Sequence, residues 1–146
     1  WHLPLQQALA KSTDEGIAAI AGKAVKEVSY HLRTSSEWMI RFGDGTDESH
    51  QRAQQALDAL WTFTGDLFVQ DDVHKQMVTA GIAPDLSPIK AAFDATIDKV
   101  LAEATLKRPA DGFMASGGRE GKHSEHLGYM LAEMQYLQRA HPGASW

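Results

Sequence analysis

The residues of this sequence best suited to chemistry are a carboxylate and an imidazole about one helical turn apart, Glu27 and His31. Di-iron carboxylate proteins built from helices use Glu-x-x-His, because residues i and i+3 share a helix face and can hold the same metal. Here the i+3 position is Tyr30, and the histidine comes one residue later. The pair therefore either supplies two metal ligands or forms a hydrogen bond at the border of a core-facing helix.

Three other acid–histidine pairs have the i, i+3 spacing, and each lies near an expected helix start. They are Asp47/His50, Asp71/His74 and Glu120/His123. Acidic residues at a helix start cap free N–H groups and interact favourably with the helix dipole, so we expect capping rather than metal binding. The chain has no cysteine, which excludes disulfides, Cys-ligated zinc, iron–sulfur clusters and thiol nucleophiles from it.

A second candidate site is the glycine-rich segment 107–122, which contains four basic residues: Lys107, Arg108, Arg119 and Lys122. Arg119 and Lys122 come just before the last expected helix, and a helix N-terminus can bind phosphate. The segment lacks the spacing of a Walker loop. It is therefore either a weak phosphate site or a solvated surface loop.

Helical periodicity dominates the elements that must position these residues, and no segment alternates as a half-buried strand would. Apolar side chains recur every three or four residues from 15 to 42, which predicts one long core-facing helix. Expected helix starts lie at Asp14, Thr46, Ser87 and Ser124. Short connections favour antiparallel neighbours, so the sequence predicts an all-α bundle, with residues 1–146 as one domain.

The composition fits such a domain and argues against several partners. Apolar residues make up 43% and charged residues 23% of the 146 positions, as in ordinary globular proteins. The net charge of −5 argues against nucleic acid as a partner. No apolar run approaches the roughly 20 residues that cross a bilayer, and we expect a cytoplasmic protein. The segment that begins at Trp1 looks like the middle of an apolar helix, so we expect an N-terminal portion to be missing.

Three blocks of the sequence resemble one protein family. The first is the segment 24–38, and the second, at 41–50, is Arg-Phe-Gly-Asp-Gly-Thr-Asp-Glu-Ser-His, similar to the family's Arg-x-Gly-Asp-Gly-Thr-x-x-Ser-His. The third, at 121–135, is Gly-Lys-His-Ser-Glu-His-Leu-Gly-Tyr-Met-Leu-Ala-Glu-Met-Gln. The family is the structural, PaaC-type (also called PaaI-type) subunit of bacterial ring-1,2-phenylacetyl-CoA epoxidase. The similarity covers essentially the whole chain.

The resemblance implies a ferritin-like antiparallel bundle, of which this chain would be the C-terminal part without the first helices. It implies a subunit with no catalytic residue and no cofactor of its own, which binds and supports a catalytic oxygenase subunit. That partner would carry the di-iron centre, and a separate reductase would use NADPH, FAD and an iron–sulfur cluster. The complex would insert one oxygen atom into the ring of phenylacetyl-CoA in aerobic phenylacetate breakdown.

The resemblance also suggests roles for individual side chains. Large aromatic residues are candidate anchors for the catalytic subunit, with ordinary core packing as the alternative. They are Trp38, Trp61, Phe63 and Phe68. Arg119 and Lys122 are weak candidates for holding the phosphates of coenzyme A. The alternative function is a di-metal oxidase or oxygenase that combines Glu27 and His31 with acids from the missing helices.

Overall fold

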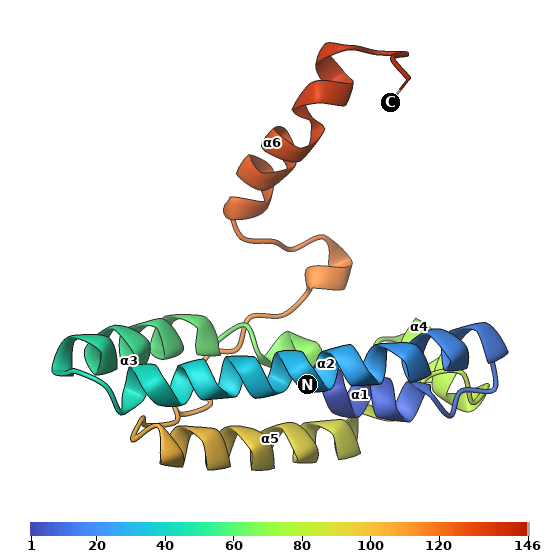
Figure 1. Ribbon diagram of the computed structural model, residues 1–146. Helices are drawn as coiled ribbons and strands as arrows, with labels where there is room; N and C mark the ends of the chain where they lie inside the picture. Colours follow the sequence, from blue (N-terminus) through green and yellow to red (C-terminus); the bar gives the residue numbers. More distant parts are fainter. Residues whose placement is uncertain (146) are drawn as a thin grey trace. The chain divides into compact units, whose positions relative to one another are not determined.

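The computed structural model describes residues 1–145, which form six α-helices and two short 3-10 helices (Figure 1). These residues contain no β-strand, so the predicted all-α class is confirmed, and the helical arrangement is consistent with a ferritin-like bundle. The residues group into two compact units, one spanning Trp1–Ala115 and one beginning at Ser116. The single domain spanning 1–146 stays a prediction.

The first unit is built around one long helix. It contains α1 (His2–Leu9), α2 (Glu15–Gly43), α3 (Asp47–Trp61), α4 (Asp72–Thr79) and α5 (Leu86–Glu103), with the 3-10 turn η1 (Gly65–Phe68). The helix α2 packs against α1, α3 and α5. Figure 1 shows α3 running back along α2, as predicted for antiparallel neighbours, whereas α5 runs in the same direction as α2. The segment containing α4 returns the chain to the end of the unit where α2 begins. The helix α5 starts there and can therefore run parallel to α2.

Side-chain caps begin α2, α3, α4 and α5 of the first unit, whereas α1 has none. The carboxylate of Asp14 accepts a hydrogen bond from the Ile17 amide at 2.9 Å, and that of Asp71 accepts one from the His74 amide at 2.7 Å. Capping was therefore the correct prediction for Asp71. The N-cap expected at Ser87 was wrong by two residues, because Asp85 caps the helix by accepting from the Ser87 amide at 2.9 Å.

One cluster of the core lies where the C-terminal ends of α2 and α5 meet the first half of α3. Its fully or nearly buried members are Leu101, Ala104 and Leu106. Partly buried residues from α2, α3 and α5 surround them: Met39, Ile40, Ala53, Leu57 and Ile97. The long stripe that the sequence predicted on α2 therefore contributes to this core through Met39.

The motif at 41–50 forms the corner between α2 and α3. Gly43 is buried, and a Cβ atom there would collide with the backbone carbonyl of Ala104, so only glycine allows α2 to approach the end of α5 this closely. Thr46 and Ser49 form a capping box, each side chain bonding the other's backbone amide, at 3.2 and 3.0 Å. The imidazole Nδ1 of His50 lies 2.7 Å from the carbonyl oxygen of Gly43. The residues that carry the family resemblance here are therefore structural in this fold.

The second unit contains the 3-10 turn η2 (Gly118–Glu120) and the helix α6 (His126–Ala140). The start of α6 was expected near Ser124, and the structure places the N-cap at Glu125, without a side-chain hydrogen bond. One face of α6 carries apolar residues at helical spacing, among them Leu127, Leu131 and Met134. No helix within residues 1–145 is both long enough and apolar enough to cross a membrane.

Candidate partner interface

The Glu27–His31 pair lies on the solvent-exposed side of α2. The Glu27 carboxylate and the His31 Nε2 are 3.8 Å apart, and both side chains are mostly exposed. This separation allows an ion pair when His31 is protonated, and it is too long for a hydrogen bond. Within residues 1–145, no three His, Asp or Glu side chains are grouped closely enough to hold a metal. The pair offers two ligands only, and a metal role for it stays a prediction.

Arg119 and Lys122 belong to the second unit, at and after the turn η2. The Lys122 ammonium lies 3.4 Å from the carboxylate of Glu120, so an acidic side chain lies next to one of the two proposed phosphate ligands. That carboxylate opposes an added anion. Both basic residues are exposed, and their role toward coenzyme A stays a prediction. Arg108, from the same basic segment, belongs instead to the first unit.

Trp61 is a core residue of the first unit. Its side chain is about 5% exposed, and its indole N–H donates to the Asp111 carboxylate at 2.9 Å. The guanidinium of Arg108 lies 5.0 Å above the ring centre, a cation–π contact. The sequence left two roles open for Trp61, an anchor for the catalytic subunit or ordinary core packing. Its burial agrees with core packing.

A network of charges next to Trp61 was missed in the sequence. Arg108 donates to Asp94 and to Asp98, each at 2.7 Å, and Lys90 donates to Asp94 at 2.8 Å. The hydrogen bond from Lys90, assisted by Arg108, lowers the pKa of Asp94 below its ordinary value. The hydrogen bonds to Asp98 and Asp94 raise the pKa of Arg108. Through these hydrogen bonds, Arg108 holds the segment after α5 against α5 itself.

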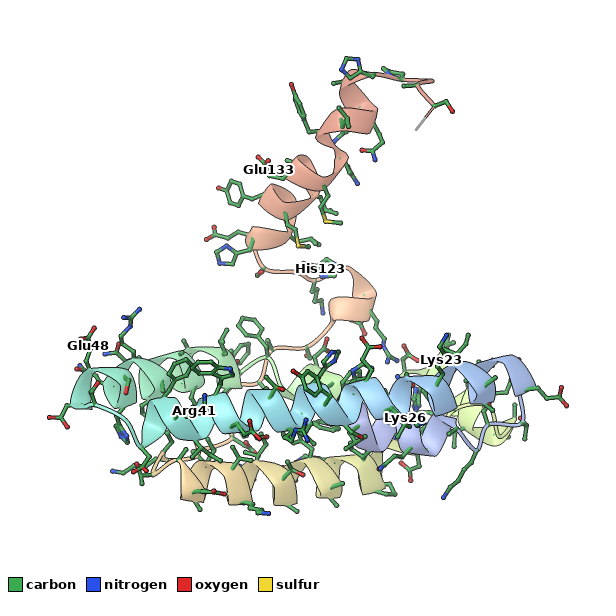
Figure 2. All side chains as sticks on the ribbon, in the orientation of Figure 1. Lys23, Lys26, Arg41, Glu48, His123 and Glu133 are labelled. Carbon is green, nitrogen blue, oxygen red and sulfur yellow. The ribbon has the colours of Figure 1, made fainter. Side chains whose placement is uncertain are left out.

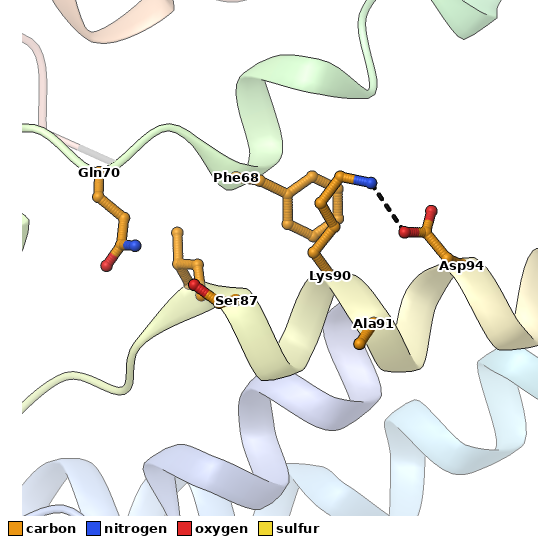
Figure 3. A pocket seen from close by; sticks show the side chains of 7 residues that line it. Phe68, Gln70, Ser87, Lys90, Ala91 and Asp94 are labelled. Atoms are coloured by element: carbon orange, nitrogen blue, oxygen red, sulfur yellow. Dashed lines mark hydrogen bonds and ion pairs between the residues drawn. The ribbon is translucent and has the colours of Figure 1, made fainter. Parts of the chain in front are cut away.

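Phe68 is half-buried at a surface pocket beside this network (Figure 3). The pocket has a volume of about 310 Å³, and Figure 3 shows the Lys90–Asp94 pair at its edge. The Lys90 ammonium lies 5.6 Å from the centre of the Phe68 ring. Because the cations and carboxylates here already satisfy one another, the pocket is best explained as part of the α5 surface rather than as a ligand site.

Trp38 and Phe63, unlike Trp61, are exposed. Trp38 is about 50% and Phe63 about 51% exposed, and two residues that the sequence analysis missed, Phe42 and Leu60, are also exposed. The rings of Trp38 and Phe42 lie 5.4 Å apart. Phe42 could have been found from its spacing, because it follows Trp38 by one helical turn and shares its face. We call this set, with Ala56 of α3, the α2–α3 face: Trp38, Phe42, Ala56, Leu60 and Phe63.

Large aromatic and aliphatic side chains are thus exposed on two neighbouring helices, α2 and α3. The chain belongs to the phenylacetic acid catabolic protein family, which matches residues 1–146. It is 47% identical, over all its 146 residues, to one of the subunits of the 1,2-phenylacetyl-CoA epoxidase of Escherichia coli (strain K12). The chain spans 59% of that relative's length. The family resemblance inferred from the three sequence blocks is therefore confirmed.

Proposed function

We propose that this protein is a non-catalytic structural subunit of a cytoplasmic multicomponent monooxygenase that epoxidises the ring of phenylacetyl-CoA. Its role is to bind the catalytic oxygenase subunit and support it. The observation that carries the proposal is the α2–α3 face, where Trp38, Phe42 and Leu60 are each exposed and the rings of Trp38 and Phe42 lie 5.4 Å apart. Large aromatic side chains of this kind contribute much of the binding energy at protein interfaces. The relationship to an epoxidase subunit supports the choice of partner.

In this proposal, the residues of this chain supply binding and positioning only. The di-iron centre belongs to the catalytic subunit, and the reductase component supplies electrons from NADPH through FAD and an iron–sulfur cluster. The exposed Glu27 and His31 fit this division, because two ligands on one helix fall short of the carboxylate-rich set that a di-iron site requires. A contribution of Arg119 and Lys122 to the phosphates of coenzyme A is a subordinate part of the proposal.

The test is to titrate the catalytic subunit with the full-length protein by calorimetry and to measure the iron content of each by elemental analysis. We expect saturable binding and iron only in the catalytic subunit. Iron bound in stoichiometric amount by the full-length protein alone, and lost in Glu27→Ala and His31→Ala, would instead establish the di-metal oxidase. Absence of binding would contradict the structural role.

A further inference from the structure

A small cavity adjoins the pocket of Figure 3 and shares Phe68, Lys90 and Asp94 with it. Its volume is about 110 Å³. Aromatic rings form much of its lining: the centres of the stacked Trp61 and Phe93 rings lie 6.3 Å apart, and those of Phe68 and Phe93 lie 5.3 Å apart. These rings come from α3, η1 and α5, so the fold brings three separate elements together around this space.

The segment that follows α5 forms one wall of the cavity, and we call its residues 107–115 the strap. Three residues of the strap line the cavity: Arg108, Asp111 and Met114. Beyond the bonds of its charged side chains, the strap is held by Thr62, whose hydroxyl donates to the carbonyl of Phe113 at 2.7 Å. The Phe113 side chain itself is about 86% exposed. Because polar bonds rather than buried apolar side chains hold much of the strap, it can open at a lower cost than the bundle can unfold.

The charged groups in the lining neutralise one another. Both cations, Lys90 and Arg108, donate to Asp94. The Asp111 carboxylate accepts a hydrogen bond from the Trp61 indole at 2.9 Å. A charged ligand would have to displace one of these partners, because a buried charge is costly unless it is paired. An uncharged ligand needs no such exchange.

Other basic side chains of the first unit lie elsewhere. Figure 2 shows Lys23, Lys26 and Arg41 on α2. The residues that line the cavity come instead from α3, from η1 and the residue before it, from α5 and from the strap. The two cations of the lining are therefore the paired ones, and the aromatic faces are what the cavity offers to a ligand.

The size of the cavity fits a single ring. A protein cavity of about 150 Å³ with apolar walls takes up benzene. The cavity beneath the strap is smaller, but Met114 forms part of its wall. A methionine side chain adapts its shape readily and makes favourable contacts with aromatic rings through its sulfur atom.

We propose that this cavity binds one uncharged aromatic ring beneath the strap. The bound ring packs against Trp61, Phe68 and Phe93 at the offset or edge-on geometry that aromatic rings prefer. The strap opens to admit it, and Met114 closes over it. This inference goes beyond the proposed function and does not depend on it, because every residue that carries it belongs to the first unit.

The experiment measures binding of fluorobenzene to the full-length protein by fluorine NMR. We expect saturable binding, and at least about tenfold weaker binding of para-fluorobenzoate, whose charge has no free partner in the cavity. In Met114→Phe, a ring attached to the strap occupies the cavity, and we expect affinity for fluorobenzene to fall at least about tenfold. The matched control is Met134→Phe, the same change at an exposed position of α6, which should leave affinity unchanged.

A second variant and a second measurement keep the proposal testable if Met114→Phe does not fold. Met114→Ala enlarges the cavity, and we expect it to bind fluorobenzene about twofold or more tighter than wild type. Fluorobenzene should also slow the hydrogen exchange of the Ala115 amide, which donates to the Thr62 carbonyl at 2.9 Å when the strap is closed.

Three results would overturn the proposal. The first is no saturable binding of fluorobenzene by wild type or by Met114→Ala. The second is equal affinity of wild type and a folded Met114→Phe, which would place the bound ring elsewhere. The third is equal affinity for fluorobenzene and para-fluorobenzoate, which would contradict the selection of an uncharged ring. Each of them leaves the proposed function standing, because none involves the catalytic subunit.

Discussion

The Nδ1 atom of His50 lies 2.7 Å from the carbonyl oxygen of Gly43, across the turn that joins α2 to α3. The same carbonyl accepts a second, longer hydrogen bond from the Thr105 hydroxyl, at 3.3 Å. A carbonyl at the end of a helix has no partner within the helix, and here residues from α3 and from the segment after α5 supply its donors. One backbone oxygen thus connects the ends of three helices.

Replacing His50 tests how much this connection contributes. In His50→Ala, the partly buried Gly43 carbonyl loses its shorter hydrogen bond, and we expect the free energy of unfolding to fall by about 1–3 kcal/mol. In His50→Asn, an amide N–H can take the place of Nδ1–H, and we expect part of the loss to be recovered. Urea denaturation measures both. His31→Ala, on the exposed side of α2, is the control and should change stability little.

The buried glycine of the corner allows a paired experiment within one helix. In Gly43→Ala, the added methyl group collides with the Ala104 backbone, and we expect a loss of about 1–3 kcal/mol or more. In Gly22→Ala, the methyl group meets no atom within 4 Å, and we expect a gain of about 0.5–1 kcal/mol from helix propensity. Thermal unfolding followed by circular dichroism should show the two midpoints moving in opposite directions. Equal shifts would contradict the close approach of α2 to the end of α5.

The two tryptophans Trp61 and Trp38 should separate stability from binding. Trp61 is buried and hydrogen-bonded, so Trp61→Ala is expected to lower stability by about 3–5 kcal/mol. Trp38 is half-exposed, so Trp38→Ala should change stability by only about 0.5 kcal/mol and should weaken binding of the catalytic subunit. Denaturation and calorimetry on the same preparations check both statements. A Trp38 variant with full affinity would remove this residue from the interface.

The lowered pKa of Asp94 predicts an acid dependence of stability. Because the folded state depresses this pKa below the ordinary value, the carboxylate stabilises the fold above about pH 4, and the contribution disappears as pH falls through the depressed value. Asp94→Asn should therefore lower the urea midpoint at neutral pH and reduce its fall between about pH 4 and pH 2. Lys90→Met, which removes the main cause of the shift, should act in the same direction. If the urea midpoints of both variants changed with pH as the wild-type midpoint does, the role of the network would be contradicted.

Local features of the fold could be predicted from the sequence because they depend on neighbouring residues. Asp14, Thr46 and Asp71 cap helices as their types and positions indicate. The proximity of Glu27 and His31 also followed from helical spacing. Their exposure did not, because it depends on which other elements cover α2, and periodicity along one helix carries no such information.

Contacts between distant segments could not be predicted in this way. Trp61 and Asp111 are 50 positions apart, and the carboxylates that bind Arg108 lie 10 and 14 positions before it. The resemblance identified the block at 41–50 as specific, but it did not give the reason, which is the approach of Ala104 to Gly43. Tertiary packing sets these relationships, and side-chain type alone does not determine them.

The most direct test of the structural role is the phenylacetyl-CoA turnover of the catalytic subunit and reductase, measured with and without the full-length version of this protein. We predict that the protein is inert alone and raises or restores turnover when it is added. We also predict that the variant Trp38→Ala needs a higher concentration for the same effect. Turnover by this protein in the absence of the catalytic subunit would contradict the account. So would full turnover by the catalytic subunit and reductase without this protein.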